Sequence, residues 1–216
     1  MNMMRFTTMK TKLRKYPSIF LILLLAISSC FLTGCVNQHP KDSKKSSQGE
    51  SVETMLEITD PKEKQAVLNA KAKVKALSGN PRIVATSPAV ADICDKLDLD
   101  LVGVPKSSVS KIPSRYKKVK KVGLAMSPDM EIVSSLNPDW ILAPSSLETD
   151  LKPKFEELKN TEYAFLNLRS VQGMYRSVQE LGEIFGKQQE AEKMTKEFTT
   201  FYKSYTKRNK NKKHPK

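Results

Sequence analysis

The sequence predicts an α/β fold with a mostly parallel sheet flanked by helices, and three observations lead to this prediction. Short apolar runs typical of buried strands begin near residues 82, 101, 140 and 163. Segments with apolar residues at helical spacing follow most of these runs. Proline, glycine and serine separate the two kinds of pattern. Strands that alternate with helices in this way usually form a parallel sheet with helices on both faces.

The elements are expected in the following order. A helix over residues 62–77 follows Asp60-Pro61, but its apolar face is thin, and an extended tether is the alternative. A strand at 82–86 leads into Ser87-Pro88, which is an N-cap followed by proline at the first helical position. A second strand at 101–104 is followed by a polar loop.

The second half of the chain continues this alternation. An extended piece at 121–123 precedes Met126, and Ser127-Pro128-Asp129 then caps a short helix. The remaining elements are a strand at 140–143, a helix at 147–158, a strand at 163–166, a helix at 171–185 and a long charged helix at 188–208. Ligands of such sheets bind at the carboxyl ends of the strands. We therefore expect the loops after the strands to gather at one edge; these loops carry Ser87, Ser107, Met126 and Ser145.

The amino terminus has the three zones of an export signal. A basic stretch at 1–15 precedes an apolar run at 19–27, and this run is too short to span a bilayer comfortably. The third zone is Leu32-Thr33-Gly34-Cys35. The last four residues resemble the bacterial lipobox, in which a lipid is attached to the cysteine and cleavage leaves that cysteine first. Fatty acids such as palmitate on Cys35 would then anchor the chain. A simple membrane anchor with an incidental cysteine is the alternative.

Four regions are expected on this basis: a lipoprotein signal peptide at 1–34, a flexible tether at 35–80, an α/β ligand-binding lobe at 81–187, and a long helix with a basic tail at 188–216. Export removes Cys30 and lipid occupies Cys35, so Cys94 remains alone and no intramolecular disulfide is expected. A lone cysteine on an apolar helix face is usually a small buried hydrophobe.

The formal net charge of +14 is concentrated in the signal and in two basic runs near the ends of the mature chain. Such runs are solvated next to a membrane, or attract anionic lipid or an acidic wall. Nucleic-acid binding is not expected, because the chain is exported and no aromatic residues interleave with the basic runs. An enzyme is not expected either, since the chain lacks a metal-spaced histidine cluster, a nucleophile elbow and a phosphate-binding glycine loop.

Three stretches carry a family resemblance: residues 82–86, Leu-Asp-Leu-Asp-Leu-Val-Gly at 97–103, and Gly-Leu-Ala-Met-Ser-Pro-Asp-Met-Glu at 123–131, with Asn-Pro-Asp-Trp-Ile at 137–141 after them. Together they resemble the substrate-binding lipoproteins of iron-compound ABC importers. The Gly-x-x-x-x-Pro-x-x-Glu pattern is shared by siderophore and cobalamin binders. The methionine within it, together with Asp-Leu-Asp-Leu-Val-Gly at 98–103, favours the haem-binding lipoproteins of the iron-regulated surface determinant (Isd) system of Gram-positive bacteria.

The resemblance implies a fold of two Rossmann-like lobes joined by one long helix, with the ligand in the cleft between them. This chain would supply the first lobe and the interlobe helix, without the second lobe. An uncovered interlobe face would expose apolar surface and favour association.

The resemblance also implies roles for individual residues. Met126 is expected to be an axial ligand of haem iron through its thioether sulfur, with core packing as the alternative. Met130, one turn into the helix, is expected in the core. Haem propionates are expected at the helix start and in the next loop, where a plain helix cap and a solvated loop are the alternatives; these residues are Ser87, Pro88, Ala89, Ser107 and Ser108. Glu131 is expected to dock on the permease. The second axial ligand has no counterpart, because neither His39 nor His214 matches it.

The function predicted from this resemblance is that of a lipid-anchored haem-binding protein on the outer face of a Gram-positive cell membrane. It would carry haem b as its transported ligand to an ABC permease, with cell-wall haem donors as further partners. Three alternatives remain open: a siderophore or iron-chelate binder of the same superfamily, a truncated product without transport function, and an unrelated adhesive lipoprotein.

Overall fold

The computed structural model of the chain describes residues 5–6 and 56–209, all of which belong to one compact unit. The apolar run of the expected signal, the lipid site Cys35, residues 35–55 of the expected tether and the tail after residue 209 lie outside these residues. None of the helices within the described ranges is long and apolar enough to cross a membrane.

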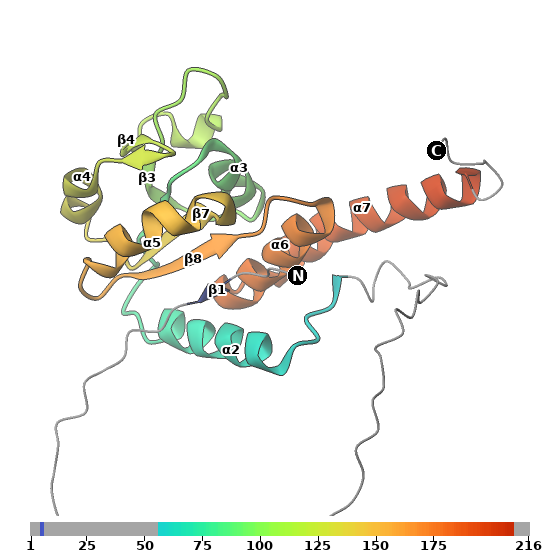
Figure 1. Cartoon of the computed structure of the whole chain (residues 1–216). Coiled ribbons are helices and arrows are strands. Elements are labelled where there is room, and N and C mark those ends of the chain that lie inside the picture. The colour runs from blue at the N-terminus through green and yellow to red at the C-terminus, as the bar shows by residue number, and fades with distance from the viewer. Residues whose placement is uncertain (1–4, 7–55, 210–216) are drawn as a thin grey trace, which may run out of the picture. The chain divides into compact units, whose positions relative to one another are not determined.

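The centre of the unit is a six-stranded sheet, five of whose strands are parallel (Figure 1). The parallel strands are β2 (Ile83–Ala85), β3 (Leu101–Val104), β4 (Lys120–Lys121), β7 (Trp140–Pro144) and β8 (Glu162–Leu166). Their spatial order is β8-β7-β2-β3-β4, so the direction of winding reverses between β2 and β7. The predicted α/β fold with a mostly parallel sheet is confirmed.

The short strand β1 (Arg5–Phe6) extends the sheet by pairing antiparallel with β8. This strand was not expected from the sequence, because its residues show no strand pattern. Both residues belong to the stretch interpreted as an export signal, and that interpretation stays a prediction.

Helices cover both faces of the sheet because alternate strand residues point in opposite directions. Trp140 and Leu142 pack with α3 (Pro88–Lys96) and α6 (Val171–Phe185) on one face. Ile141 and Ala143 pack with α4 (Met130–Ser135) and α5 (Glu148–Glu156) on the other. Cys94 is fully buried on α3, which confirms its expected place in the core.

Helix α2 (Pro61–Lys75) packs against α6, next to the edge of the sheet formed by β1 and β8. Asp60 caps it by accepting a hydrogen bond from the Lys62 N–H at 2.8 Å, and Val67 and Ala70 are buried. The expected flexible tether up to residue 80 is therefore wrong for this part. The thin apolar face of α2 buries these two side chains, and a buried ion pair between Glu63 and Arg176 of α6, at 3.2 Å, also attaches the helix to the lobe.

Helix α7 (Gln188–Asn209) runs back along α6 after a tight turn. Gly186 supplies the turn with a φ of 70°, a conformation that favours glycine. Ring stacking between Tyr175 of α6 and Phe198 of α7, at 4.5 Å between centroids, marks the end of this packing. The remainder of α7 extends past the start of α6 (Figure 1).

Candidate ligand-binding edge of the sheet

The carboxyl ends of β2 and β7 lie side by side at the point where the strand order reverses. Thr86 follows β2 directly and donates two hydrogen bonds to the Leu142 carbonyl of β7. Its N–H lies 3.0 Å from that oxygen and its hydroxyl lies 3.3 Å from it. The loops that begin at Ser87 and Ser145 therefore leave the sheet next to each other. Such a switch point is the usual ligand position in open α/β sheets.

Ser87 begins α3 as an N-cap, as its sequence context predicts. Its hydroxyl oxygen accepts a hydrogen bond from the Val90 N–H at 3.3 Å, and the residue is nearly buried. Pro88 has no N–H to donate, whereas Ala89 is exposed in the same turn. The hydroxyl of Ser87 is thus engaged within the helix, so the exposed part of this turn is the backbone around Ala89.

The loop after β3 carries Ser107 and Ser108. The Lys106 N–H donates to the Gly123 carbonyl at 2.6 Å, which fixes this loop beside the segment that leads to Met126. Ser107 accepts a hydrogen bond from the Ser110 N–H at 3.0 Å, while Ser108 is exposed. The structure therefore brings the second expected propionate region close to the methionine segment.

Two contacts hold the far end of this loop against the body of the lobe. The Tyr116 hydroxyl donates to the Leu99 carbonyl at 2.5 Å. The guanidinium of Arg115 donates to the carboxylates of Asp98 and Asp100, each at 2.8 Å. The partners in these contacts, residues 98–100, lie between α3 and β3. The serine-bearing part of the loop is therefore held at one end by these contacts and at the other by the bond from Lys106 to Gly123.

Met126 lies in a tight hairpin that was not expected from the sequence. In place of one extended piece at 121–123, the chain forms β4, then Val122, and then a second sheet of β5 (Gly123–Leu124) and β6 (Ser127–Pro128). Val122 separates β4 from β5, because its N–H donates to the Val104 carbonyl at 2.9 Å and its side chain is fully buried. Ala125 and Met126 form the turn of the hairpin.

The exposure of Met126 bears on one of its two interpretations, packing in the core. Its side chain is 72% exposed, so it does not pack in the core of the described lobe. Met130, four residues later, is half-buried against the second hydrophobic cluster, which agrees with its expected place in the core. A thioether held at the tip of a hairpin is available to a ligand.

Gly123 shapes this hairpin. Its φ is 94°, and a Cβ at this position would lie 2.9 Å from the Asp129 nitrogen, which is closer than real Cβ atoms approach backbone. Asp129 then caps α4 by accepting hydrogen bonds from the Glu131 and Ile132 N–H groups at 3.1 Å each. Glu131 is exposed in the first turn of α4. Its docking role stays a prediction.

Cationic side chains also lie on the loops after the strands. Lys106 and Lys111 follow β3, and Arg169 follows β8; all three are exposed. Arg169 was missed in the sequence analysis, although its place just after a strand was a usable signal. Within the described residues no three His, Cys, Asp or Glu side chains are grouped so as to hold a metal ion.

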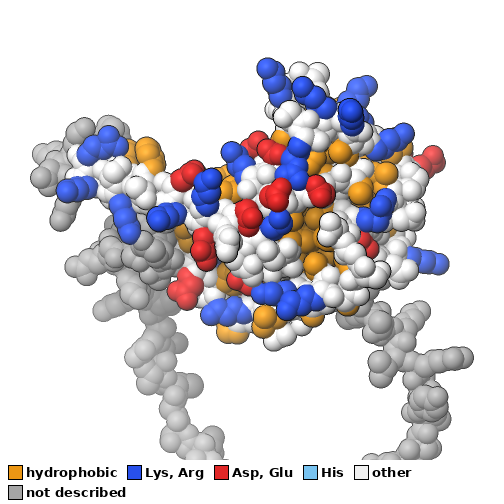
Figure 2. Space-filling model, turned by 180° about the vertical axis from the view of Figure 1, so that it is seen from behind, with side chains coloured by type: hydrophobic (Ala, Val, Ile, Leu, Met, Phe, Trp, Pro, Cys, Tyr) orange, Lys and Arg blue, Asp and Glu red, His pale blue; other side chains and the backbone are white. Residues whose placement is uncertain are grey.

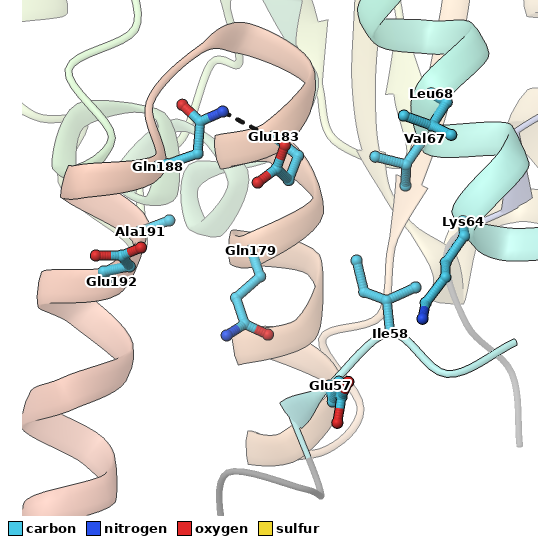
Figure 3. A pocket seen from close by; sticks show the side chains of 10 residues that line it. All are labelled: Glu57, Ile58, Lys64, Val67, Leu68, Gln179, Glu183, Gln188, Ala191 and Glu192. Atoms are coloured by element: carbon cyan, nitrogen blue, oxygen red, sulfur yellow. Dashed lines mark hydrogen bonds between the residues drawn. The ribbon is translucent and has the colours of Figure 1, made fainter.

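Two cavities of the described region lie away from this edge. One, of about 430 Å³, lies between α2, α6 and α7, with Ile58 and Val67 on its wall (Figure 3). The other, of about 510 Å³, lies at the amino ends of β7 and β8 and is lined by residues such as Asp139 and Thr161. Neither contains any of the site residues expected from the sequence.

A sequence comparison identifies the family of the described lobe. Residues 83–216 match the sequence profile of the periplasmic binding protein family. The chain belongs to this family. Periplasmic binding proteins bind substrates and are not enzymes, which agrees with the lack of catalytic motifs in the sequence.

Curated and solved periplasmic binding proteins give closer matches. The high-affinity heme uptake system protein IsdE of Staphylococcus aureus is 36% identical over 140 residues, which is 64% of this chain and 47% of IsdE. The structure of S. aureus IsdE complexed with heme superposes with a TM-score of 0.59 at 33% identity, over 63% of this chain and 53% of that one.

An ABC transporter substrate-binding protein from Listeria monocytogenes EGD-e superposes with a TM-score of 0.60 at 42% identity, over 63% of this chain and 52% of that one. The siderophore binding protein BauB superposes at 0.53, covering 63% of this chain and 51% of BauB, but at 23% identity it shows the fold alone. This periplasmic binding protein chain therefore spans about half the length of the relatives that it matches.

Proposed function

We propose that this chain is part of a membrane-anchored haem-binding lipoprotein, the substrate-binding component of an ABC importer for haem iron. The observation that carries the proposal is the exposed Met126 at the tip of the β5–β6 hairpin. The 36% identity to a heme uptake protein supports haem as the ligand class. Under this proposal haem is transported cargo and not a resident cofactor.

The residues around Met126 suit a flat, apolar ligand with two carboxylates. A thioether is a soft donor that commonly holds haem iron as an axial ligand. Leu124 of the same hairpin and Val109 of the neighbouring loop are 58% and 95% exposed, so apolar surface is available to a porphyrin. Covering such surface is favourable, by about 25 cal/mol for each Å² removed from water.

The propionates would lie at the start of α3 and at the loop after β3. We assign them to the backbone around Ala89, at the amino end of a helix dipole, and to Ser107 and Ser108, with Ser87 and Pro88 shaping the turn. Lys106 would add a positive charge to this region.

The chain would be tethered and docked through other regions. Lipid on Cys35 would hold it at the outer face of a Gram-positive cell membrane, with residues up to about Asp60 as the tether. Glu131, exposed at the start of α4, would pair with a basic residue of the permease. Cell-wall haem donors would supply the ligand.

A haemin titration tests the ligand assignment. The chain from residue 36 onward is titrated with haemin, and the Soret band is recorded for the wild type, Met126→Leu and Leu124→Ala. Met126→Leu keeps the apolar volume but removes the sulfur, so we expect a shifted Soret band and an affinity at least about tenfold weaker, in line with the cost of disturbing a metal site. Leu124→Ala removes apolar contact but no iron donor from the same hairpin, so it should weaken the affinity while keeping the wild-type spectrum. Identical spectra for the wild type and Met126→Leu would contradict the proposal.

The lipid anchor has its own test. Cys35→Ser in the full chain should move the protein from the membrane fraction of Gram-positive cells to the medium or leave it unprocessed. Lipid labelling with a radioactive fatty acid should be lost in the same variant. Labelling that persists would show that Cys35 is not the acylated residue.

A siderophore or other anionic iron chelate is the second candidate, because the cationic side chains of Lys106, Lys111 and Arg169 follow strands at the ligand edge. In this case Arg169→Gln should weaken binding of a ferric chelate, while Met126→Leu should leave it unchanged. If instead Met126→Leu weakens haemin binding and Arg169→Gln leaves it unchanged, the result supports haem as the ligand. A folded chain that binds neither ligand would support the alternative of a product without transport function.

A further inference from the structure

Charge is unevenly distributed along the described lobe. Residues 101–128 carry seven Lys and Arg side chains and no Asp or Glu. The rest of residues 56–209 carries 18 Lys and Arg against 20 Asp and Glu, so it is nearly neutral. The positive charge of this part of the chain therefore comes from one stretch, which runs from β3 through the following loop and β4 to the methionine hairpin.

Six lysines of this stretch are exposed, and we call them the basic edge: Lys106, Lys111, Lys117, Lys118, Lys120 and Lys121. Among the residues that the structure describes, none of these six side chains forms an ion pair, whereas Lys71, Lys73 and Lys187 each pair with an acid. Figure 2 shows Lys and Arg side chains gathered on the loop at the top of the view. The basic edge thus presents uncompensated charge to its surroundings.

The basic edge lies at one border of the sheet, remote from α7. Strand β4, which contains Lys120 and Lys121, is the last strand on the side opposite β1 and β8. Helix α6 contacts β8, and α7 packs on α6, so both helices lie toward the other border (Figure 1). Alternate residues of a strand point to opposite faces, but long lysine side chains on both faces can reach a flat surface that meets the strand edge-on.

We propose that the basic edge binds the surface of a bilayer that contains anionic phospholipids. Each lysine close to such a surface strengthens binding about fivefold, so several lysines together can hold the lobe there reversibly. The choice of a bilayer as the partner rests on the proposed lipid anchor, because a chain attached through Cys35 stays next to a membrane. Glu131, which we propose docks on the permease, follows the same hairpin. Contact through the basic edge would therefore turn this side of the lobe toward the membrane in which the permease lies.

Lysines on an edge strand have a second known use in proteins, since they prevent pairing with a strand of another molecule. Strand β4 has only two residues, which leaves little backbone to protect. The other four lysines of the basic edge lie outside this strand. Protection of the edge therefore does not explain most of the set.

Sedimentation with vesicles tests the proposal on the chain from residue 36 onward, which carries no lipid of its own. Vesicles of phosphatidylglycerol and phosphatidylcholine in equal parts should bind this chain at low ionic strength, and vesicles of phosphatidylcholine alone should not. A variant with Lys117→Gln, Lys118→Gln and Lys121→Gln together should bind the anionic vesicles about 100-fold more weakly. Binding of the wild type should be lost near 1 M salt, where the screening length falls to about 3 Å.

Three exposed lysines of α2, next to the opposite border of the sheet, provide the matched control. Lys62→Gln, Lys64→Gln and Lys75→Gln together remove the same charge and should weaken vesicle binding only slightly. Equal losses in the two triple variants would show adhesion through overall charge and would overturn the proposal. A wild type that does not bind the anionic vesicles would overturn it as well.

Two further outcomes would identify another role for the basic edge. Binding of long-chain polyphosphate but not of vesicles would replace the bilayer with a soluble polyanion as the partner. Aggregation of the basic-edge variant with unchanged vesicle binding would show that these lysines only protect the sheet edge. Because the chain tested carries no lipid and no haemin is added, failure of this proposal leaves the proposed anchor and haem site untouched.

Discussion

The buried acid Glu180 should make the stability of this lobe fall as the pH rises. Its side chain lies on α6 with no solvent exposure, near Glu63 of α2 and Arg176 of α6. Burial, and then the neighbouring Glu63, raise the pKa of Glu180 from 4.5 to about 9. The folded chain therefore holds this proton at neutral pH, whereas the unfolded chain releases it.

The sign and size of the effect follow from proton linkage. Below the unfolded pKa of 4.5 both states are protonated and the stabilising contribution is fully present. Between that pH and the folded pKa, the folded state binds more protons than the unfolded state, so stability is lost at about 1.4 kcal/mol per pH unit. From pH 5 to pH 8 the loss amounts to about 4 kcal/mol.

Glu180→Gln isolates this effect because glutamine has nearly the same shape and does not titrate. Urea unfolding of both proteins at several pH values should show equal stability near pH 5, and a growing advantage of Glu180→Gln towards pH 8. The advantage should reach a few kcal/mol, about 4 at most. A difference between the two proteins that is independent of pH would refute the reasoning.

Glu183→Gln is the matched control, three residues further along α6. A hydrogen bond from Lys71 lowers the pKa of Glu183, so its stabilising contribution is present above the unfolded pKa and is lost as the pH falls through the folded pKa. In the range from about pH 5 upward, the difference between Glu183→Gln and the wild type should therefore be flat.

Three further predictions concern the site and the core. Gly123→Ala should destabilise the lobe by about 1–3 kcal/mol in urea unfolding, because it forces a side chain into a positive φ and against backbone; Gly79→Ala, with no atom within 4 Å of the new Cβ, should cost much less. Ser87→Ala should cost about 1 kcal/mol of stability through loss of the α3 cap, and should leave haemin affinity nearly unchanged if the ligand meets the backbone; a large affinity loss would show that the hydroxyl binds the ligand. Burial raises the pKa of the Cys94 thiol to about 12. In the folded chain from residue 36 onward, Cys94 should therefore not react with a thiol reagent at pH 8, and it should react once the chain unfolds. Rapid labelling of the folded chain would contradict the burial of Cys94.

Several expectations from the sequence agree closely with the structure because they depend on local patterns. The helix Val171–Phe185 has the predicted bounds, since serine caps its start and a glycine in the left-handed conformation follows its end. The strand Leu101–Val104 also has the predicted bounds, and Ser87 caps the next helix as expected. Apolar periodicity and capping residues act over a few positions, so sequence alone reveals them.

Other features depend on contacts between distant residues. The hairpin that exposes Met126 forms because Val122 bonds to Val104, a contact across the sheet. The thin apolar face of α2 gave no reason to place it on the lobe, and its docking also buries Glu63 against Arg176. Glu180 has an ordinary polar position in the sequence and becomes a buried acid in the packed lobe, where Glu63 of α2 lies beside it.

The sequence by itself determined the alternation of strands and helices, the family to which they belong, and the methionine as the candidate ligand, because each is written in short, local patterns. Only the tertiary structure decided that this methionine is exposed, that its hairpin adjoins the loop after β3, and that α2 packs on the lobe. These outcomes depend on which segments pack together in space, and the free energy of that packing is shared among residues far apart in the chain.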